Sequence, residues 1–188
     1  SFNPVHIGHL AIANYIHEYS DLEEIWFVVS PHNPLKKKSS LLEDYHRVRL
    51  AEIAIGEDER FRISDIESKL PQPSYTIDTL TYLGERNPER EFALIMGSDN
   101  LSTIHKWKNA EVLIKNYPIF VYPRKGKGRE PDPALRPLLQ SAHINIVEAP
   151  EIEISGTFIR SAIKEGKDIR HFLPPGVWGY VKDMHFYE

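Results

Sequence analysis

The sequence predicts an α/β fold with an open, mainly parallel sheet, helices on both faces and a short C-terminal helical extension. Short apolar runs alternate with amphipathic stretches along almost the whole of the 188 residues. Such alternation is typical of repeated strand–helix units joined by right-handed crossovers. The runs are continuously apolar, as in parallel strands that are covered on both faces. Ligands of such sheets bind outside the carboxyl ends of the strands.

Five segments are predicted to form strands. Residues 60–67 alternate between apolar and polar side chains, which indicates one strand. Trp26 lies within another and is expected in the core. The continuously apolar segments, which are expected to be buried, are residues 24–30, 92–96, 118–122 and 144–147.

Five further segments are predicted to form helices. The first spans residues 9–19, where apolar side chains recur at i, i+3, i+4 and i+7 and so share one face. These side chains are Ile12, Tyr15, Ile16 and Tyr19. Similar patterns predict helices over residues 44–55, 75–86, 109–116 and 155–166.

A single domain over residues 1–188 is predicted, because the chain shows no internal repeat and no long linker. Residues 155–188 are expected to be its C-terminal helical part. The one break in composition, over residues 123–137, is rich in proline, glycine and charge, which indicates an exposed loop.

The composition excludes several classes of protein. With 41% hydrophobic and 11% aromatic residues the chain is not disordered. A balance of 23 basic against 27 acidic residues argues against a nucleic-acid partner. The absence of cysteine excludes disulfides, thiolate zinc sites and cysteine nucleophiles. No apolar run is long enough for a bilayer and no signal peptide is visible, so a soluble, cytoplasmic domain is expected. Whether it forms a homo-oligomer stays open.

Two histidines stand at the start of the first predicted helix, in the segment PVHIGHL. His6 and His9 are three residues apart, with Gly8 between them. A helix beginning near Gly8 would present free N–H groups and the positive end of its dipole beside both imidazoles, which suits a phosphate. Gly8 would also let a ligand approach the backbone. By itself the motif fits two ordinary histidines equally well. Zinc is disfavoured, because no third ligand is obviously placed.

A second polar cluster, ISGTFIR, opens the helix predicted over residues 155–166. Ser155 is a natural N-cap, and Thr157 supplies a second hydroxyl. Gly156 exposes the backbone, and Arg160 places a guanidinium about one turn into the helix. This set suits phosphate oxygens. Taken alone, however, an ordinary capped helix with a solvated arginine explains it better.

Together, the HxGH and ISxTxxR motifs resemble those of the nucleotidyltransferase α/β superfamily. In the Rossmann-like fold of that superfamily, both motifs surround a bound triphosphate. Further segments resemble those of one family within it, the bacterial nicotinate-nucleotide adenylyltransferases. These segments are residues 30–36, 45–48, 73–80, 96–99 and 106–108. The resemblance extends from the first residue to about residue 175. In that family a short strand ending in glycines precedes the segment that matches SFNP. The sequence is therefore expected to lack one strand, typically about 5–6 residues, with its turn.

The resemblance implies roles for individual residues. It implies that His6, His9 and Arg160 are catalytic, with His9 stabilising charge in the transition state; a nearby triphosphate should favour protonated His9. The residues implied to bind ATP and its phosphates are Ser1, Phe2, Gly8, Lys36, Arg47, Gly97, Asp99, Ser155, Gly156 and Thr157. Those implied to bind the nicotinate nucleotide are Tyr75, Thr76, Trp107 and Lys108.

Structural alternatives exist for Tyr75, Trp107 and Asp99, and that for Tyr75 is stronger than that for Trp107. Trp107 is implied to stack on the pyridine ring, while backbone N–H groups near Thr76 and Lys108 receive the nicotinate carboxylate. The alternative for Trp107 is packing beneath its own loop. Asp99 is implied to lie near the ribose hydroxyls, and the alternative is a helix cap.

The activity implied is transfer of the adenylyl group of ATP to nicotinate mononucleotide, a step of NAD biosynthesis. Mg²⁺ is expected to enter with ATP, because no carboxylate cluster indicates a protein-held ion. Two alternatives stay open: phosphopantetheine adenylyltransferase, which shares both motifs, and a non-catalytic module that binds ATP.

Overall fold

The computed structural model describes residues 2–31, 41–124 and 143–188. Two compact units divide the chain. The first unit is discontinuous and comprises Ser1–Ser74 and Ile154–Glu188, whereas the second unit is the continuous segment Tyr75–Glu153. That residues 1–188 act as one domain stays a prediction.

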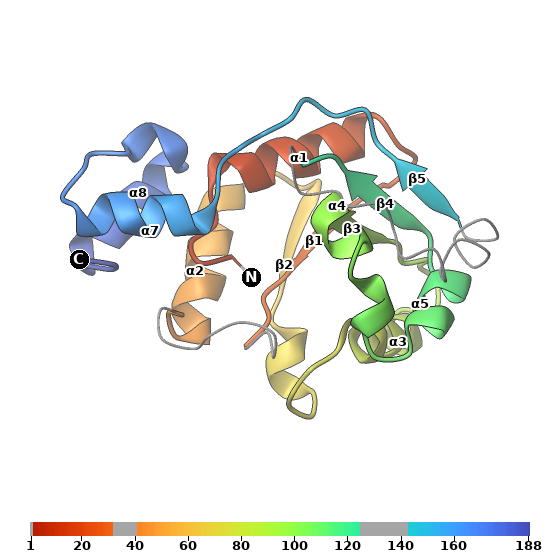
Figure 1. Ribbon diagram of the computed structural model, residues 1–188. Coiled ribbons are helices and arrows are strands. Elements are labelled where there is room, and N and C mark those ends of the chain that lie inside the picture. The colour runs from red at the N-terminus through yellow and green to blue at the C-terminus, as the bar shows by residue number, and fades with distance from the viewer. Residues whose placement is uncertain (1, 32–40, 125–142) are drawn as a thin grey trace. The chain divides into compact units, whose positions relative to one another are not determined.

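The first unit contains a parallel pair of strands and most of the long helices (Figure 1). Strands β1 and β2 run parallel, with Ile25 opposite Phe61 and Val28 opposite Ser64. Its elements before the second unit are α1 (Ile7–Glu18), β1 (Ile25–Val28), α2 (Asp44–Ile55), β2 (Phe61–Ser64) and the 3₁₀ turn η2 (Ile66–Lys69). Those after it are α7 (Gly156–Lys164), η5 (Arg170–Phe172) and α8 (Pro175–Asp183).

The core of the first unit joins distant parts of the sequence. Leu50 of α2, Ile159 of α7 and Val177 of α8 are each fully buried and belong to one apolar cluster. Val5, just before α1, reaches the same cluster. Pro175 opens α8, where proline is favoured because the first helical N–H needs no intrahelical partner. The expected C-terminal helical extension is therefore present, and it packs on the start of the chain.

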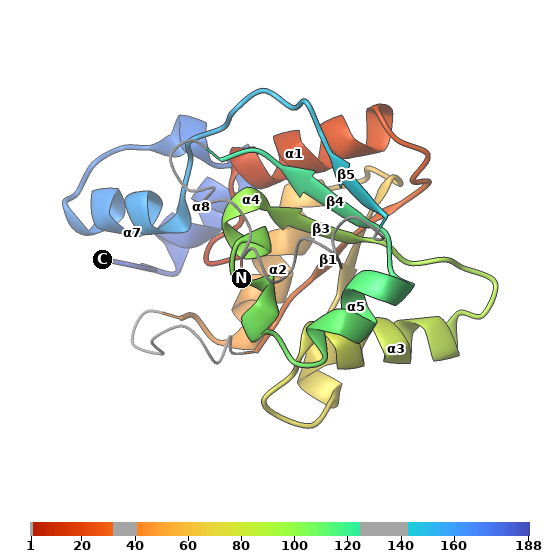
Figure 2. The same cartoon turned by 45° about the vertical axis from the view of Figure 1, so that its right-hand side comes forward.

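The second unit is a three-stranded parallel sheet of order β3-β4-β5 with α3 and α5 side by side (Figure 2). Gly97, the last residue of β3, stands opposite Tyr122, the last of β4. Its core includes the fully buried Leu113 and Ile119. The elements are α3 (Thr76–Arg86), β3 (Leu94–Gly97), α4 (Ser98–Leu101), η3 (Ile104–Lys106), α5 (Ala110–Asn116), β4 (Ile119–Tyr122) and β5 (Ile144–Ile146).

The predicted parallel α/β architecture is confirmed, and all ten predicted strands and helices are found near their expected ranges. Three expectations about burial were wrong. Tyr19 lies beyond the end of α1 and is 74% exposed, so the buried face of α1 is narrower than predicted. In β5, Ile146 is 72% exposed, because β5 is the last strand of its sheet among the described residues. Trp26 is only half-buried, and the guanidinium carbon of Arg62 lies 5.8 Å from the centroid of its ring.

Most of the loop predicted over residues 123–137 lies outside the described residues. Within the described ranges, we find no helix with both the length and the apolar character needed to cross a membrane.

Candidate active site

The two histidines lie at the start of α1, where the sequence places them. His6 is the N-cap residue and is 4% exposed, and its ring stacks on that of His9 with centroids 3.6 Å apart. The backbone N–H of His6 donates to Nδ1 of His9 at 3.2 Å. Nδ1 of His9 is thus the acceptor in this bond. The protonated form expected beside a triphosphate stays a prediction.

Phe2 supports the His9 ring from a second side. Its ring meets that of His9 edge-on, at 5.0 Å between centroids, and packs on Phe27 of β1 at 5.4 Å. The side chain of Phe2 therefore orients an imidazole, and its expected contact with ATP stays a prediction.

Helix α7 begins as the sequence predicts. Ser155 is the N-cap, and its hydroxyl oxygen accepts a hydrogen bond from the backbone N–H of Phe158 at 3.2 Å. The hydroxyl proton is not used in this bond, so Ser155 can cap the helix and donate to a ligand as well. Ser155 and Thr157 are both exposed.

The two motifs meet through Asn3, Gly156 and Arg160. Nη1 of Arg160 donates to the backbone carbonyl of Asn3 at 2.8 Å, and Nη2 donates to the hydroxyl of Thr157 at 3.4 Å. A Cβ at Gly156 would lie 2.9 Å from the carbonyl oxygen of Asn3. Glycine is therefore required here for the approach of two backbone segments, whatever ligand also binds. Hydrogen-bond donors of both motifs are gathered within the first unit.

Arg47 is fully buried, unlike an ordinary phosphate ligand. Its Nε donates to the carbonyl of Leu42 at 3.0 Å, and its Nη2 donates to that of Pro31 at 3.2 Å and to Asp44 at 2.6 Å. Of the three guanidinium nitrogens of Arg47, Nη1 is the one without a hydrogen-bond partner among the described residues. The expected contact with a phosphate stays a prediction, with one nitrogen left to make it.

Gly97 and Asp99 follow β3 in the second unit. Gly97 is the N-cap of α4 and Asp99 lies in its first turn, so the alternative that Asp99 caps a helix is wrong. A Cβ at Gly97 would overlap Oδ1 of Asp99. That oxygen is buried and has no partner among the described residues, whereas Oδ2 pairs with Arg124 at 3.4 Å.

Arg124 pairs with an expected site residue, Asp99, and is a candidate that the sequence analysis missed. It follows β4, the neighbour of β3, and its Nη2 donates to the hydroxyl of Tyr122 at 2.6 Å. Burial raises the pKa of Tyr122, so the phenol stays neutral beside the guanidinium. Because parallel strands end at one edge, a basic residue after β4 could have been matched with the acidic one after β3.

The residues expected to bind the pyridine nucleotide gather at the start of α3. Tyr75 is the N-cap and Thr76 the first residue of this helix, whose first N–H groups have no intrahelical partners. Nζ of Lys108 lies 4.9 Å from the Tyr75 ring centroid and pairs with Asp78 at 2.8 Å. Trp107 is half-buried against the core of the second unit. Packing thus accounts for part of its ring, and stacking on a ligand stays a prediction.

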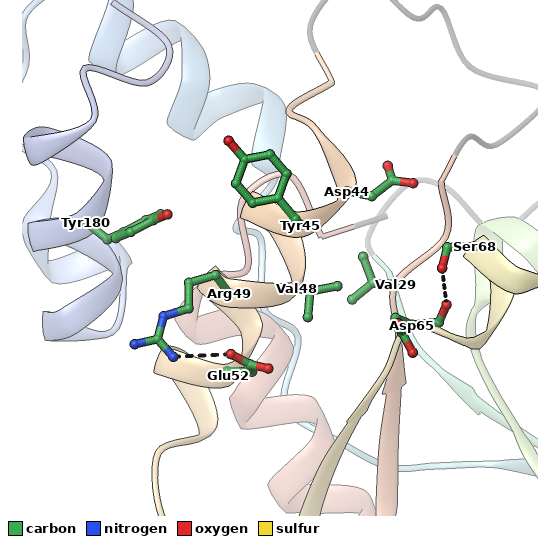
Figure 3. A pocket seen from close by; sticks show the side chains of 9 residues that line it. All are labelled: Val29, Asp44, Tyr45, Val48, Arg49, Glu52, Asp65, Ser68 and Tyr180. Atoms are coloured by element: carbon green, nitrogen blue, oxygen red, sulfur yellow. Dashed lines mark hydrogen bonds and ion pairs between the residues drawn. The ribbon is translucent and has the colours of Figure 1, made fainter.

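A cavity of about 580 Å³ lies in the first unit (Figure 3). None of the residues expected to bind substrate lines it. Its carboxylates, those of Asp44, Glu52 and Asp65, each pair with a cation at 2.6–3.2 Å, and Figure 3 shows the pair of Glu52 with Arg49. The cavity therefore presents no unpaired carboxylate among the residues described.

Two expected site residues, Ser1 and Lys36, lie outside the described residues. Within the ranges that are described, no group of three or more histidine, aspartate or glutamate side chains could hold a metal ion.

Comparison with known proteins gives three findings. The cytidylyltransferase-like family matches residues 1–162. Over 188 residues this chain is 50% identical to a protein of Flavobacterium johnsoniae and 52% identical to one of Christiangramia forsetii. Both proteins are named probable nicotinate-nucleotide adenylyltransferase, and each match covers all of this chain and 95% of the relative. The solved Plasmodium falciparum nicotinic acid mononucleotide adenylyltransferase complexed with NaAD shares the fold with a TM-score of 0.81, at 22% identity, over all of this chain and 93% of that one.

Proposed function

Because the chain belongs to the cytidylyltransferase-like family, we propose that it transfers the adenylyl group of ATP to nicotinate mononucleotide. The products are nicotinate adenine dinucleotide and pyrophosphate, in a step of NAD biosynthesis that we place in the cytoplasm. The observation that carries the proposal is the contact of Arg160 with Asn3, which gathers the donors of both motifs in one unit. The choice of acceptor is supported by relatives of that name at 50% identity along the whole chain.

The reaction is a displacement at phosphorus. An oxygen of the 5′-phosphate of the mononucleotide attacks the α-phosphorus of ATP, the bond from that phosphorus to the α–β bridging oxygen breaks, and pyrophosphate leaves with the electron pair. No protein nucleophile is needed, so the protein positions two anions and stabilises the charge on the leaving group. ATP enters as its Mg²⁺ complex.

The first unit supplies the donors for the triphosphate. His9 and the hydroxyls of Ser155 and Thr157 are the proposed donors, and Arg160 adds a fixed positive charge. Helices α1 and α7 contribute their N-terminal N–H groups and the positive ends of their dipoles. Lys36 and Ser1 complete the proposed set.

The second unit supplies the contacts for the nucleosides. Asp99 and Arg124 flank the carboxyl ends of β3 and β4, and Oδ1 of Asp99 is left for a ribose hydroxyl. The ammonium of Lys108 is already paired with Asp78. Recognition of the nicotinate carboxylate is therefore assigned to backbone N–H groups near Thr76 and Lys108, with Trp107 against the ring.

A pyrophosphate-release assay against three phosphorylated acceptors tests this proposal. With ATP and Mg²⁺, release is expected with nicotinate mononucleotide, less with nicotinamide mononucleotide and none with 4′-phosphopantetheine. Activity with phosphopantetheine alone would favour the first alternative. Binding of ATP with no release for any acceptor would favour the non-catalytic module. Either result would overturn the proposal.

A further inference from the structure

Asn3 connects the His-motif segment to three other parts of the first unit. It is 6% exposed, and its side-chain oxygen accepts hydrogen bonds from the hydroxyl of Tyr187 at 2.7 Å and from the N–H of Leu42 at 3.3 Å. Its backbone carbonyl accepts the hydrogen bond from Arg160. The residue that orients the Arg160 guanidinium is thus itself held by Tyr187.

Tyr187 is well suited to act as a fixed donor. Burial raises the pKa of its hydroxyl, so the phenol keeps its proton throughout the neutral range. Its φ is +68°, in the left-handed region that tyrosine seldom adopts, and such a conformation persists only where surrounding contacts hold it. Such contacts are present: Phe186 and Tyr187 both pack against the core cluster of the unit, and Phe186 also packs edge-on against His46.

We propose that Tyr187 is a positioning residue for the reaction: its hydroxyl fixes Asn3, and the Asn3 carbonyl in turn orients Arg160. This inference rests on the proposed function, in which Arg160 contacts the phosphates. Two of the five N–H donors of Arg160 are used inside the protein, by Asn3 and Thr157. The others serve phosphate only while the planar guanidinium keeps its orientation.

The test compares two tyrosines near the same end of the chain. Tyr187→Phe removes one hydroxyl and keeps the ring. Tyr180→Phe is the matched control, because the Tyr180 hydroxyl lies 3.0 Å from Nδ1 of His46 on α2. Tyr187→Phe is expected to lower kcat/KM for ATP about fivefold, the loss of roughly one hydrogen bond, whereas Tyr180→Phe leaves it unchanged. Melting temperatures of both variants measure the purely structural effect.

A double-mutant cycle separates positioning from stability. In an Arg160→Ala background, Tyr187→Phe is expected to have no further effect on kcat/KM, although it still lowers the melting temperature. An equal fall in kcat/KM in both backgrounds, or no fall in the single variant, would overturn the inference. Absence of pyrophosphate release by the unmodified protein would count against the proposed function instead. In that case the dissociation constant of ATP would be measured for the unmodified protein, the two single variants and the double variant. Tyr187→Phe should then raise it in the unmodified background and leave it unchanged in the Arg160→Ala background.

Discussion

The two units hold their candidate binding residues in different ways. In the first unit, Arg160 and Tyr187 contact Asn3 from 157 and 184 positions away along the chain. In the second unit, Lys108 reaches Asp78 across 30 positions and lies over the ring of Tyr75. The first arrangement gathers charge and hydrogen-bond donors from distant segments. The second arrangement joins residues that are much closer in the sequence, around the aromatic ring of Tyr75.

Under the proposed function, this difference assigns catalysis to the first unit and the choice of acceptor to the second. Donors to a triphosphate serve every acceptor alike, so changes in the first unit should lower turnover with any mononucleotide. Contacts with the pyridine ring are made by one substrate only, so changes in the second unit should act on the binding of the acceptor. The predictions below test this division, beginning with the largest effect.

His9→Ala should lower kcat about 10²–10³-fold with both mononucleotides, because a donor to the charge that develops on the leaving pyrophosphate is lost. The dissociation constant of ATP, measured by calorimetry, should change much less. His17→Ala on the same helix is the control and should keep its activity. Near-normal turnover in a folded His9→Ala protein would remove His9 from the reaction.

Arg160→Ala should lower kcat/KM for ATP about a hundredfold, and Arg160→Lys should recover little of it. A lysine ammonium is a point charge that cannot contact Asn3 and a phosphate through one rigid, planar group. Steady-state kinetics of the two variants measure the difference. Full activity of the lysine variant would mean that Arg160 supplies charge alone.

Nicotinate mononucleotide should be preferred over the nicotinamide form by tenfold to somewhat over a hundredfold in kcat/KM. An amide would turn its NH₂ toward a backbone donor, and an unpaired buried polar group costs about 1–3 kcal/mol. Trp107→Ala should weaken both acceptors about three- to tenfold without changing their order, since the ring contact is common to both. Equal efficiency of the two acceptors, or reversal in Trp107→Ala, would contradict this account of the second unit.

Asp78→Asn should have the smallest effect, about two- to threefold on KM for the acceptor. The pair of Asp78 with Lys108 is 43% exposed on both sides, and such pairs contribute little to stability. Freed Lys108 should lower KM for the anionic nicotinate form more than for the amide. A large change in KM for ATP would show that the division between the units is wrong.

The sequence predicted those features that have a local cause. The N-cap at Ser155 and the start of α1 beside His6 follow from residues within one turn of each helix. The contact of Tyr187 with Asn3 has no such signature, because neither residue stands in a pattern that refers to the other. The complete burial of Arg47 was also missed, since its carbonyl partners at Pro31 and Leu42 carry no side-chain signal.

Two further misses concern short elements. Helix α4 has only four residues, too few for a periodic pattern, so Asp99 could not be assigned to a first helical turn. Arg124 was included in a segment predicted as an exposed loop. Its partners Asp99 and Tyr122 become apparent only when β3 and β4 are aligned as neighbours.

The discontinuity of the first unit also orders events during synthesis. Chains grow from the N-terminus at about 5–20 residues per second, and domains generally fold as units. Residues 75–153 form the second unit without any later residue, so it can fold while the rest is still being made. Asn3 is made before the second unit, whereas Arg160 and Tyr187, which contact it, are made after that unit. A nascent chain that stalls after residue 153 would therefore carry a complete second unit without the contacts of Arg160 and Tyr187 with Asn3.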